Sequence, residues 1–238
     1  VAITIPAASL QALTEGDTYN LTANVSDAAG NAAVQDSATS FAVDVTAPTI
    51  GTVTTSWGSV INAAEDDNDG VVTVITDGVE NDQTVTVALN GQSYNVTVTS
   101  YNMAITIPAA DLQALTDDST YSLTANVSDA AGNAAAQNDT TSFAVDVTAP
   151  TIVAVSASWG NAVNAADDDN DGTVTVTTKG AEDGQTVTVA LNGTDYTGDV
   201  SSGSAAITIP AADFQALTDG GTYNLTANVS DAAGNAAV

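Results

Sequence analysis

Apolar and polar residues alternate along much of the chain, with the period of two that places successive side chains on opposite faces of a strand. In TYSLTANVS (120–128), Tyr121 and every second residue after it are aromatic or aliphatic, and the residues between them are serine, threonine or asparagine. The run TVTVALNG (84–91) alternates in the same way and ends in Asn-Gly, which favours a two-residue hairpin turn. This pattern predicts antiparallel strands with one buried face.

The pattern predicts seven strands between residues 52 and 147. They cover 52–57, 72–76, 84–91, 92–98, 104–108, 120–128 and 141–147. One segment, PAADLQALTDD (108–118), is helical in pattern, with a proline at its start and two leucines three positions apart. Short strands at this turn spacing predict an all-β fold, an antiparallel β-sandwich of about seven strands.

The whole pattern repeats, since AITIPAA begins at Ala2, Ala104 and Ala206, a spacing of 102 residues. The run SFAVDVTAPTI begins at Ser40 and again at Ser142. A unit of this length matches one domain, because the repeats of solenoids span roughly 20–50 residues. The sequence therefore predicts a tandem array of domains.

The repeat divides the chain into three units. Residues 1–46 form the C-terminal part of one unit (strands E to G), residues 47–148 a complete unit, and residues 149–238 a unit that lacks its last strand. The opening VAITIP has the pattern of the middle of a domain, so both termini look like cuts in a longer chain.

One tyrosine in each unit opens the strand that follows the helical segment. In an immunoglobulin-like (Ig-like) sandwich, a tyrosine at this place forms a corner in which its hydroxyl group bonds to upstream backbone. The three residues are Tyr19, Tyr121 and Tyr223. The sequence thus predicts tandem Ig-like sandwiches joined end to end as a rod.

Charge limits the partners and the chemistry. The chain has 29 acidic residues against a single basic one, Lys179, and a net charge of −28. This charge excludes nucleic acid and argues against anionic membrane surfaces, and no segment suggests direct membrane insertion. Because the chain has no cysteine and no histidine, zinc, copper and iron are poor candidates and little supports catalysis. Carboxylates and carbonyls alone favour calcium.

Acidic loops are predicted to meet between successive units. With the strands lettered A to G, the A–B loop (62–70) and the aspartate near the end of strand G (Asp44 or Asp146) lie at the C-terminal end of a unit. The B–C loop and the F–G loop, which contains DAAGN, lie at the N-terminal end. Carboxylates that converge without a basic partner require a cation. The candidate ligands in the B–C and F–G loops are Glu80, Glu182, Asp27, Asp129, Asn133, Asp231 and Asn235.

The A–B loop also carries a motif of its own. Asp167, Asp169 and Asp171 followed by glycine fit D-x-D-x-D-G, which directs alternate oxygens at one calcium ion, and the glycine is expected to permit a sharp turn. The preceding unit keeps Glu65, Asp67 and Asp69 at these positions. The closing glutamate of an EF-hand is absent, and a strand follows in place of a helix. The alternative interpretation is a solvated acidic turn.

The runs VDVTAPTI, INAAE, QTVTVALNG, PAADLQAL and DAAGN together resemble the bacterial Ig-like repeats of giant surface adhesins. The resemblance covers the whole chain and implies a secreted protein of the bacterial cell surface, with long repeat stalks and calcium at domain junctions. It implies calcium binding at Asp44, Asp146, Glu65, Asp167, Glu80, Glu182, Asp27, Asp129 and Asp231. The acidic insertion after NAAE departs from the family pattern, which leaves the number of ions open.

The sequence favours a non-enzymatic, extracellular stalk that serves cell adhesion or biofilm formation and is stiffened by calcium between neighbouring repeats. One alternative is a building block of a surface filament or S-layer, in which copies of the protein also pack together. A second is a repeat that binds glycan or cells. A third is a halophile protein whose acidic surface serves hydration, with no preference for calcium.

Overall fold

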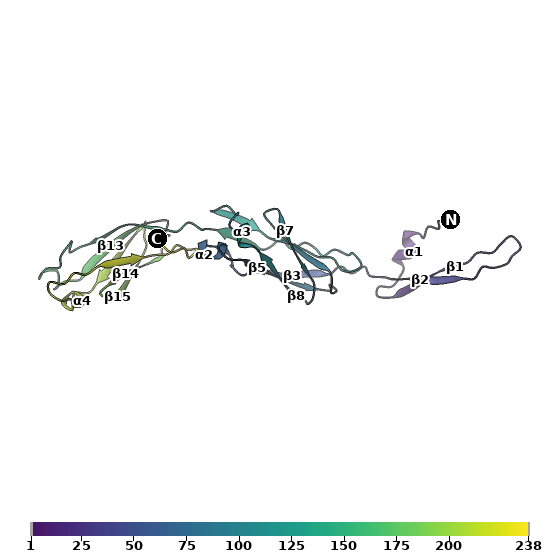
Figure 1. Ribbon diagram of the computed structural model, residues 1–238, viewed down its shortest axis with the longest axis horizontal. Coiled ribbons are helices and arrows are strands. Elements are labelled where there is room, and N and C mark those ends of the chain that lie inside the picture. Colours follow the sequence, from purple (N-terminus) through teal and green to yellow (C-terminus); the bar gives the residue numbers. More distant parts are fainter. Residues whose placement is uncertain (1, 238) are drawn as a thin grey trace.

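The structure, a computed structural model, describes residues 2–237, apart from the side chains of residues 36–38. Three units follow one another along a single long axis (Figure 1). The middle and third units each have a hydrophobic core of their own. The chain is built from strands with a few short helices, which confirms the all-β prediction.

The middle unit is a sandwich of three-stranded sheets. Their orders are β3-β5-β8, β10-β6-β7 and β4-β11-β9, with β4 parallel to β11 and the other pairs antiparallel. Its elements are β3 (Thr49–Thr55), β4 (Val60–Ile61), α2 (Ala63–Asp66), β5 (Gly70–Asp77), β6 (Thr84–Leu89), β7 (Gln92–Thr97), β8 (Asn102–Ile107), α3 (Ala109–Leu112), β9 (Ser119–Ser122), β10 (Thr124–Asn126) and β11 (Ser142–Val145).

The other two units contain parts of the same plan. The first unit has α1 (Ala7–Gln11) and the hairpin of β1 (Thr18–Ala23) and β2 (Asp36–Ala42). The third unit contains β12 (Thr151–Ala157), β13 (Gly172–Lys179), β14 (Thr186–Leu191), β15 (Thr194–Asp199), β16 (Ser204–Ile209), α4 (Ala211–Gln215) and β17 (Leu225–Asn228).

Two features predicted from local patterns are confirmed. The turn between β6 and β7 has positive φ at both Asn90 (49°) and Gly91 (81°), as a tight hairpin turn of this sequence requires. The Tyr121 hydroxyl oxygen accepts the backbone N–H of Thr116 at 2.8 Å, and the same bond recurs at Tyr19 and Tyr223 at 2.9 Å. The tyrosine corner therefore joins the end of each helical segment to the next strand.

Other boundaries differ from the prediction. Residues 120–128 form two strands, because β9 pairs with β11 whereas β10 pairs with β6. The alternation still marks the buried face, since Leu123, Ala125 and Val127 are all buried. The helix α3 has only four residues, and the chain after it turns to reach Asp118, which has a positive φ of 58°.

The core of the middle unit is centred on Phe143 of β11. Its ring packs edge-on against Trp57, with ring centroids 5.2 Å apart, and is stacked on Tyr121 at 6.2 Å. Phe143 is 2% exposed and Trp57 is 6% exposed. Strand β11 therefore closes the sandwich through one large aromatic side chain.

Candidate functional site

The junction between the middle and third units is organised by Asn235 of the third unit's F–G loop. Its Nδ2 donates hydrogen bonds to the backbone carbonyl of Asp146 at 2.9 Å and to the carboxylate of Asp231 at 3.0 Å. Its Oδ1 accepts the backbone N–H of Ala63 at 2.8 Å. Asn235 is 5% exposed, so one buried amide joins three segments from two units.

The A–B loop of the middle unit completes this contact. Asn62 caps the short helix α2 through a capping box with Glu65, and its Nδ2 donates to the carbonyl of Ala233 in the next unit at 3.0 Å. The predicted meeting of the A–B loop with the following F–G loop is therefore confirmed by direct hydrogen bonds between units.

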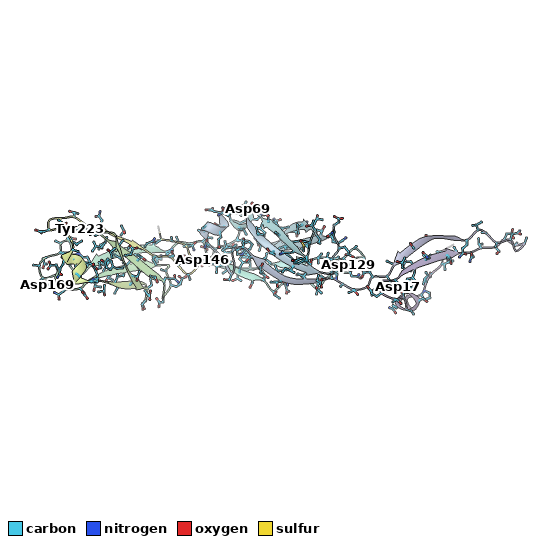
Figure 2. All side chains as sticks on the ribbon, turned by 90° about the horizontal axis from the view of Figure 1, so that it is seen from below. Asp17, Asp69, Asp129, Asp146, Asp169 and Tyr223 are labelled. Atoms are coloured by element: carbon cyan, nitrogen blue, oxygen red, sulfur yellow. The ribbon has the colours of Figure 1, made fainter. Side chains whose placement is uncertain are left out.

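Four carboxylates interact electrostatically at this junction. Burial raises the pKa of Asp146, and the negative charges of Asp231, Asp117 and Glu182 raise it further. Asp231 is buried and accepts the backbone N–H of Asn235, and Glu182 accepts the N–H of Ala232. The structure places the predicted ligands Asp146, Glu182 and Asp231 at one junction (Figure 2 labels Asp146).

The junction between the first and middle units repeats this arrangement. The Asn133 Nδ2 donates to the Asp44 carbonyl at 3.2 Å and to the Asp129 carboxylate at 2.8 Å. Glu80 accepts the N–H of Ala130 at 3.0 Å. The Thr46 N–H lowers the pKa of Asp44, but burial and the charges of Asp129 and Glu15 outweigh it, so the net shift is upward.

Sequence reasoning missed one acidic position, which Asp117 occupies in the second junction and Glu15 in the first. Asp117 accepts the N–H of Val147 and the hydroxyl of Thr148, and Glu15 accepts the N–H of Val45. Each side chain thereby fixes the backbone that leaves strand G. The signal was available, because the residue after ALT is acidic in all three copies, Asp219 being the third.

The aspartates of the A–B loop have partners within their own unit. The Oδ1 atoms of Asp69 and Asp171 accept the N–H groups of Ala109 and Ala211 at 2.9 Å. These N–H groups begin α3 and α4, whose N-cap residues are prolines without a side-chain cap. A loop aspartate thus accepts the hydrogen bond of the first helical N–H group, which the side chain of an N-cap proline cannot accept. Asp67 similarly accepts the Gln113 side chain at 3.0 Å.

The predicted role of the glycine in this motif is wrong. Gly70 is the buried first residue of β5, and it lies outside the set of glycines with positive φ. A Cβ at this position would lie 2.3 Å from Cζ3 of Trp57. Gly172 is equally restricted by Trp159 and Phe214. The glycine is therefore required for packing against tryptophan and does not serve a sharp turn.

The remaining candidates are spread over the loops. Glu65 closes the capping box with Asn62, Asp167 accepts the backbone N–H of Asn164 in the equivalent turn of the third unit, and Asp27 bonds within its own DAAGN loop. Asp169 lies at the far end of the third unit, away from both junctions, whereas Asp69 lies on the side of the middle unit toward the third (Figure 2).

Among residues 2–237, no three acidic side chains are grouped tightly enough to hold a metal ion as they stand. Calcium binding by these residues remains a prediction.

Replacing Asp146 by asparagine tests the repulsion directly. A carboxylate whose pKa is raised by folding destabilises the folded state above its unfolded pKa, and this penalty disappears as the pH falls below it. In EDTA, we expect Asp146→Asn to raise the free energy of unfolding at pH 7, with the gain vanishing below about pH 4. Urea titrations at both pH values measure it. Asp195→Asn on the exposed face of β15 is the control, and an equal effect of the two variants would contradict junction repulsion.

Several solved structures are similar to this chain. One is a Ca²⁺-stabilized adhesin with which an Antarctic bacterium reaches out and binds ice; it is 29% identical with a TM-score of 0.47, and the alignment covers 92% of this chain and 54% of that one. This chain therefore spans about half of that structure. A tetra-tandem repeat from the extending region of a large adhesion protein is 22% identical with a TM-score of 0.37, covering 94% and 55% of the two chains.

A third structure is a bacterial immunoglobulin-like domain from the ice-binding adhesin of M. primoryensis. It is 31% identical with a TM-score of 0.30, and the alignment covers 41% of this chain and 99% of that one. No curated protein matches the sequence. None of the helices within residues 2–237 has the length and apolar character needed to cross a membrane.

The family comparison gives a direct assignment. The model of the bacterial Ig-like domain (group 3) matches residues 7–144, which is more than half of the chain. The tandem sandwiches, the tyrosine corners and the repeated junctions described above agree with this match. The chain belongs to the bacterial Ig-like domain family, group 3.

Proposed function

We propose that the chain is a section of the stalk of a secreted bacterial surface adhesin, in which calcium between units holds the sandwiches in line. The supporting observation is that carboxylates of two units repel one another at each junction, which together with burial raises the pKa of Asp146 and of Asp44, while Lys179 is the chain's only basic residue. A stalk needs length and repetition, and near-identical units joined end to end supply both. The proposed role is structural, and no residue is assigned to catalysis.

The donor set fits calcium in its chemistry. The junction offers carboxylate and carbonyl oxygens, which calcium prefers. Asp146, Asp231, Glu182 and Asp117 would hold the ion at the second junction, and their counterparts Asp44, Asp129, Glu80 and Glu15 at the first. The amide oxygen of Asn235, also a predicted ligand, accepts the Ala63 N–H and so links the two units beside these carboxylates. A bound cation would supply the positive charge that the junction lacks.

Unfolding experiments in calcium, in magnesium and in EDTA at matched ionic strength test this proposal. Extracellular modules bind calcium with Kd of about 10⁻⁴–10⁻³ M, so 10 mM calcium should stabilise each site by about 1.4–2.7 kcal/mol. Small-angle scattering on the same samples should show a fixed, elongated shape in calcium alone. Asp146→Asn should lose the calcium response of the second junction and keep that of the first, whereas the control Asp195→Asn should retain both.

Two other results would contradict the proposal. One unfolding temperature and one shape in all three solutions would mean that the carboxylates are only solvated. Stabilisation by any salt in proportion to its concentration would indicate a general halophile surface. Binding of the chain to a carbohydrate array in calcium would instead support a recognition role for the repeats.

A further inference from the structure

Strand β7 of the middle unit is an open edge of its sheet. The sheet order β10-β6-β7 places β7 at one end, and within the described part of the chain no strand pairs with its outer side. The Val98 N–H donates to the Gln83 carbonyl, so Val98 is bonded toward β6. Because backbone groups alternate between the two sides of a strand, the N–H and C=O groups of Ser93, Asn95 and Thr97 point away from β6. These groups are positioned to pair with a further strand.

This edge is uncharged in a strongly acidic protein. Residues 83–110, which contain β6, β7 and β8, include no charged residue, although the net charge of the chain is −28. The carboxylate of Asp111 accepts the Tyr94 hydroxyl at 3.0 Å, and the third unit keeps an aspartate and a tyrosine at these positions. Edge strands are commonly protected against pairing by charged side chains, and β7 has none. We call Gln92–Thr97 the neutral edge.

The third unit carries charges on the corresponding strand, β15. Asp195 and Asp199 occupy the positions of Ser93 and Thr97, and both aspartates are exposed. The turn that follows the strand also differs, since Tyr101 of the middle unit is 73% exposed and the third unit has a glycine there. Two units of nearly the same sequence therefore differ in charge and in apolar exposure at this edge.

We propose that the neutral edge pairs with the neutral edge of a second copy of this chain, in the antiparallel direction. A pair centred on Asn95 is symmetric, and it sets Ser93 of each copy opposite Thr97 of the other. The outward backbone groups of both strands then have partners. Two copies would meet where neither presents a charge, which limits the repulsion between acidic chains. In the same register β15 would set Asp195 against Asp199, and like charges directly opposite each other destabilise pairing.

Antiparallel pairing also sets the direction of the two chains. The strands of the middle unit run along the long axis of the molecule, so the paired chains would run in opposite directions (Figure 1). Stalks that leave one cell run in the same direction, whereas stalks of two facing cells run in opposite directions. The pair would therefore join facing cells. This consequence rests on the proposed stalk function, whereas the pairing itself does not.

Sedimentation velocity of the full 238-residue chain in EDTA tests the pairing without a contribution from calcium. At about 1 M NaCl the Debye length is about 3 Å, so we expect dimers to form as the concentration rises and to weaken at low salt. Ser93→Asp combined with Thr97→Asp gives β7 the residues of β15, which the same fold accommodates. This variant should weaken the dimer at least about tenfold, because two pairs of aspartates would face each other.

The control variant combines Thr52→Asp with Thr54→Asp. It adds the same charge to exposed positions of β3, which belongs to the other sheet, and it should leave the dimer unchanged. Equal weakening by the two double substitutions would overturn the inference, because it would indicate general charge repulsion. A chain that stays monomeric at all concentrations in about 1 M NaCl would also overturn it.

A single cysteine reports the register, because the chain has no cysteine of its own. Opposed residues of antiparallel strands have Cα atoms about 4.5–5.5 Å apart, which lies within the range that a disulfide spans. Asn95→Cys should therefore form disulfide-linked dimers on oxidation by diamide, and cross-linking of the control Thr52→Cys at the same rate would overturn the inference. Dimers in EDTA, together with unfolding that calcium does not change, would support the pairing and contradict only the proposed role of calcium.

Discussion

Phe143→Ala is expected to lower the free energy of unfolding of the middle unit by about 3–5 kcal/mol. The ring is 2% exposed and contacts both Trp57 and Tyr121, so its removal leaves a cavity between two aromatic side chains. Strand β11 also joins β4 and β9 into one sheet. Loss of its main anchor should weaken the sheet as well as the core.

Phe41→Ala is the matched control, because Phe41 holds the equivalent position one repeat earlier but lies half-buried on a hairpin. Its substitution should change stability by less than about 1 kcal/mol. Urea unfolding followed by tryptophan fluorescence reports on Trp57 and Trp159. Equal losses for the two substitutions would show that strand G does not anchor the sandwich as the structure indicates.

The fold was largely predictable because period-two alternation and a repeat every 102 residues are both strong signals. The strand from residue 120 to 128 illustrates the limit. Its alternation identified the buried residues Leu123, Ala125 and Val127, but the division into β9 and β10 depends on pairing with β11 and β6. Such pairings are made by residues distant in the sequence, and the local pattern does not contain them. For the same reason, β4, which has two residues, gave no signal.

The junctions could be located but not detailed. Chain order alone places the A–B loop of one sandwich opposite the F–G loop of the next, and the hydrogen bond from Asn62 to Ala233 confirms that placement. What the sequence does not show is how each polar atom is used. Asn235 was a candidate metal ligand, yet its amide bonds to Asp146, Asp231 and Ala63 in one arrangement. An amide side chain has both donors and an acceptor, so it is suited to joining backbone segments. The residue type alone does not distinguish that role from metal binding.

The acidic motif of the A–B loop can serve two roles, calcium binding and hydrogen bonding within its own unit. Its spacing fits calcium, but two of its carboxylates also satisfy N–H groups of the short helix or the side chain of Gln113. These bonds explain why carboxylates are useful in the loop even before any ion binds. They also mean that the motif alone does not decide between calcium binding and helix capping.

Gly70→Ala distinguishes a packing role of this glycine against Trp57 from a role in a metal-binding turn. The added methyl carbon would lie 2.3 Å and 2.8 Å from Trp57 ring atoms and 3.1 Å from Cδ1 of Leu112, so the tryptophan must move out of the core. We expect a loss of about 3 kcal/mol in the free energy of unfolding, at the upper end of the usual cost of overpacking. The loss should be the same in EDTA and in calcium, because packing is its cause.

Gly51→Ala is the control for this substitution, since a Cβ there would lie 3.5 Å from its nearest neighbour, the Ile75 carbonyl, which is an ordinary contact. Gly51 also lies in a strand. Because alanine loses less conformational entropy than glycine on folding, stability should stay equal or rise by up to about 1 kcal/mol. If Gly70→Ala instead left stability in EDTA unchanged and removed only the response to calcium, the glycine would belong to a metal-binding turn. That result would require the Trp57 ring to shift at little cost. A close-packed core does not favour such a shift, because the ring is only 6% exposed.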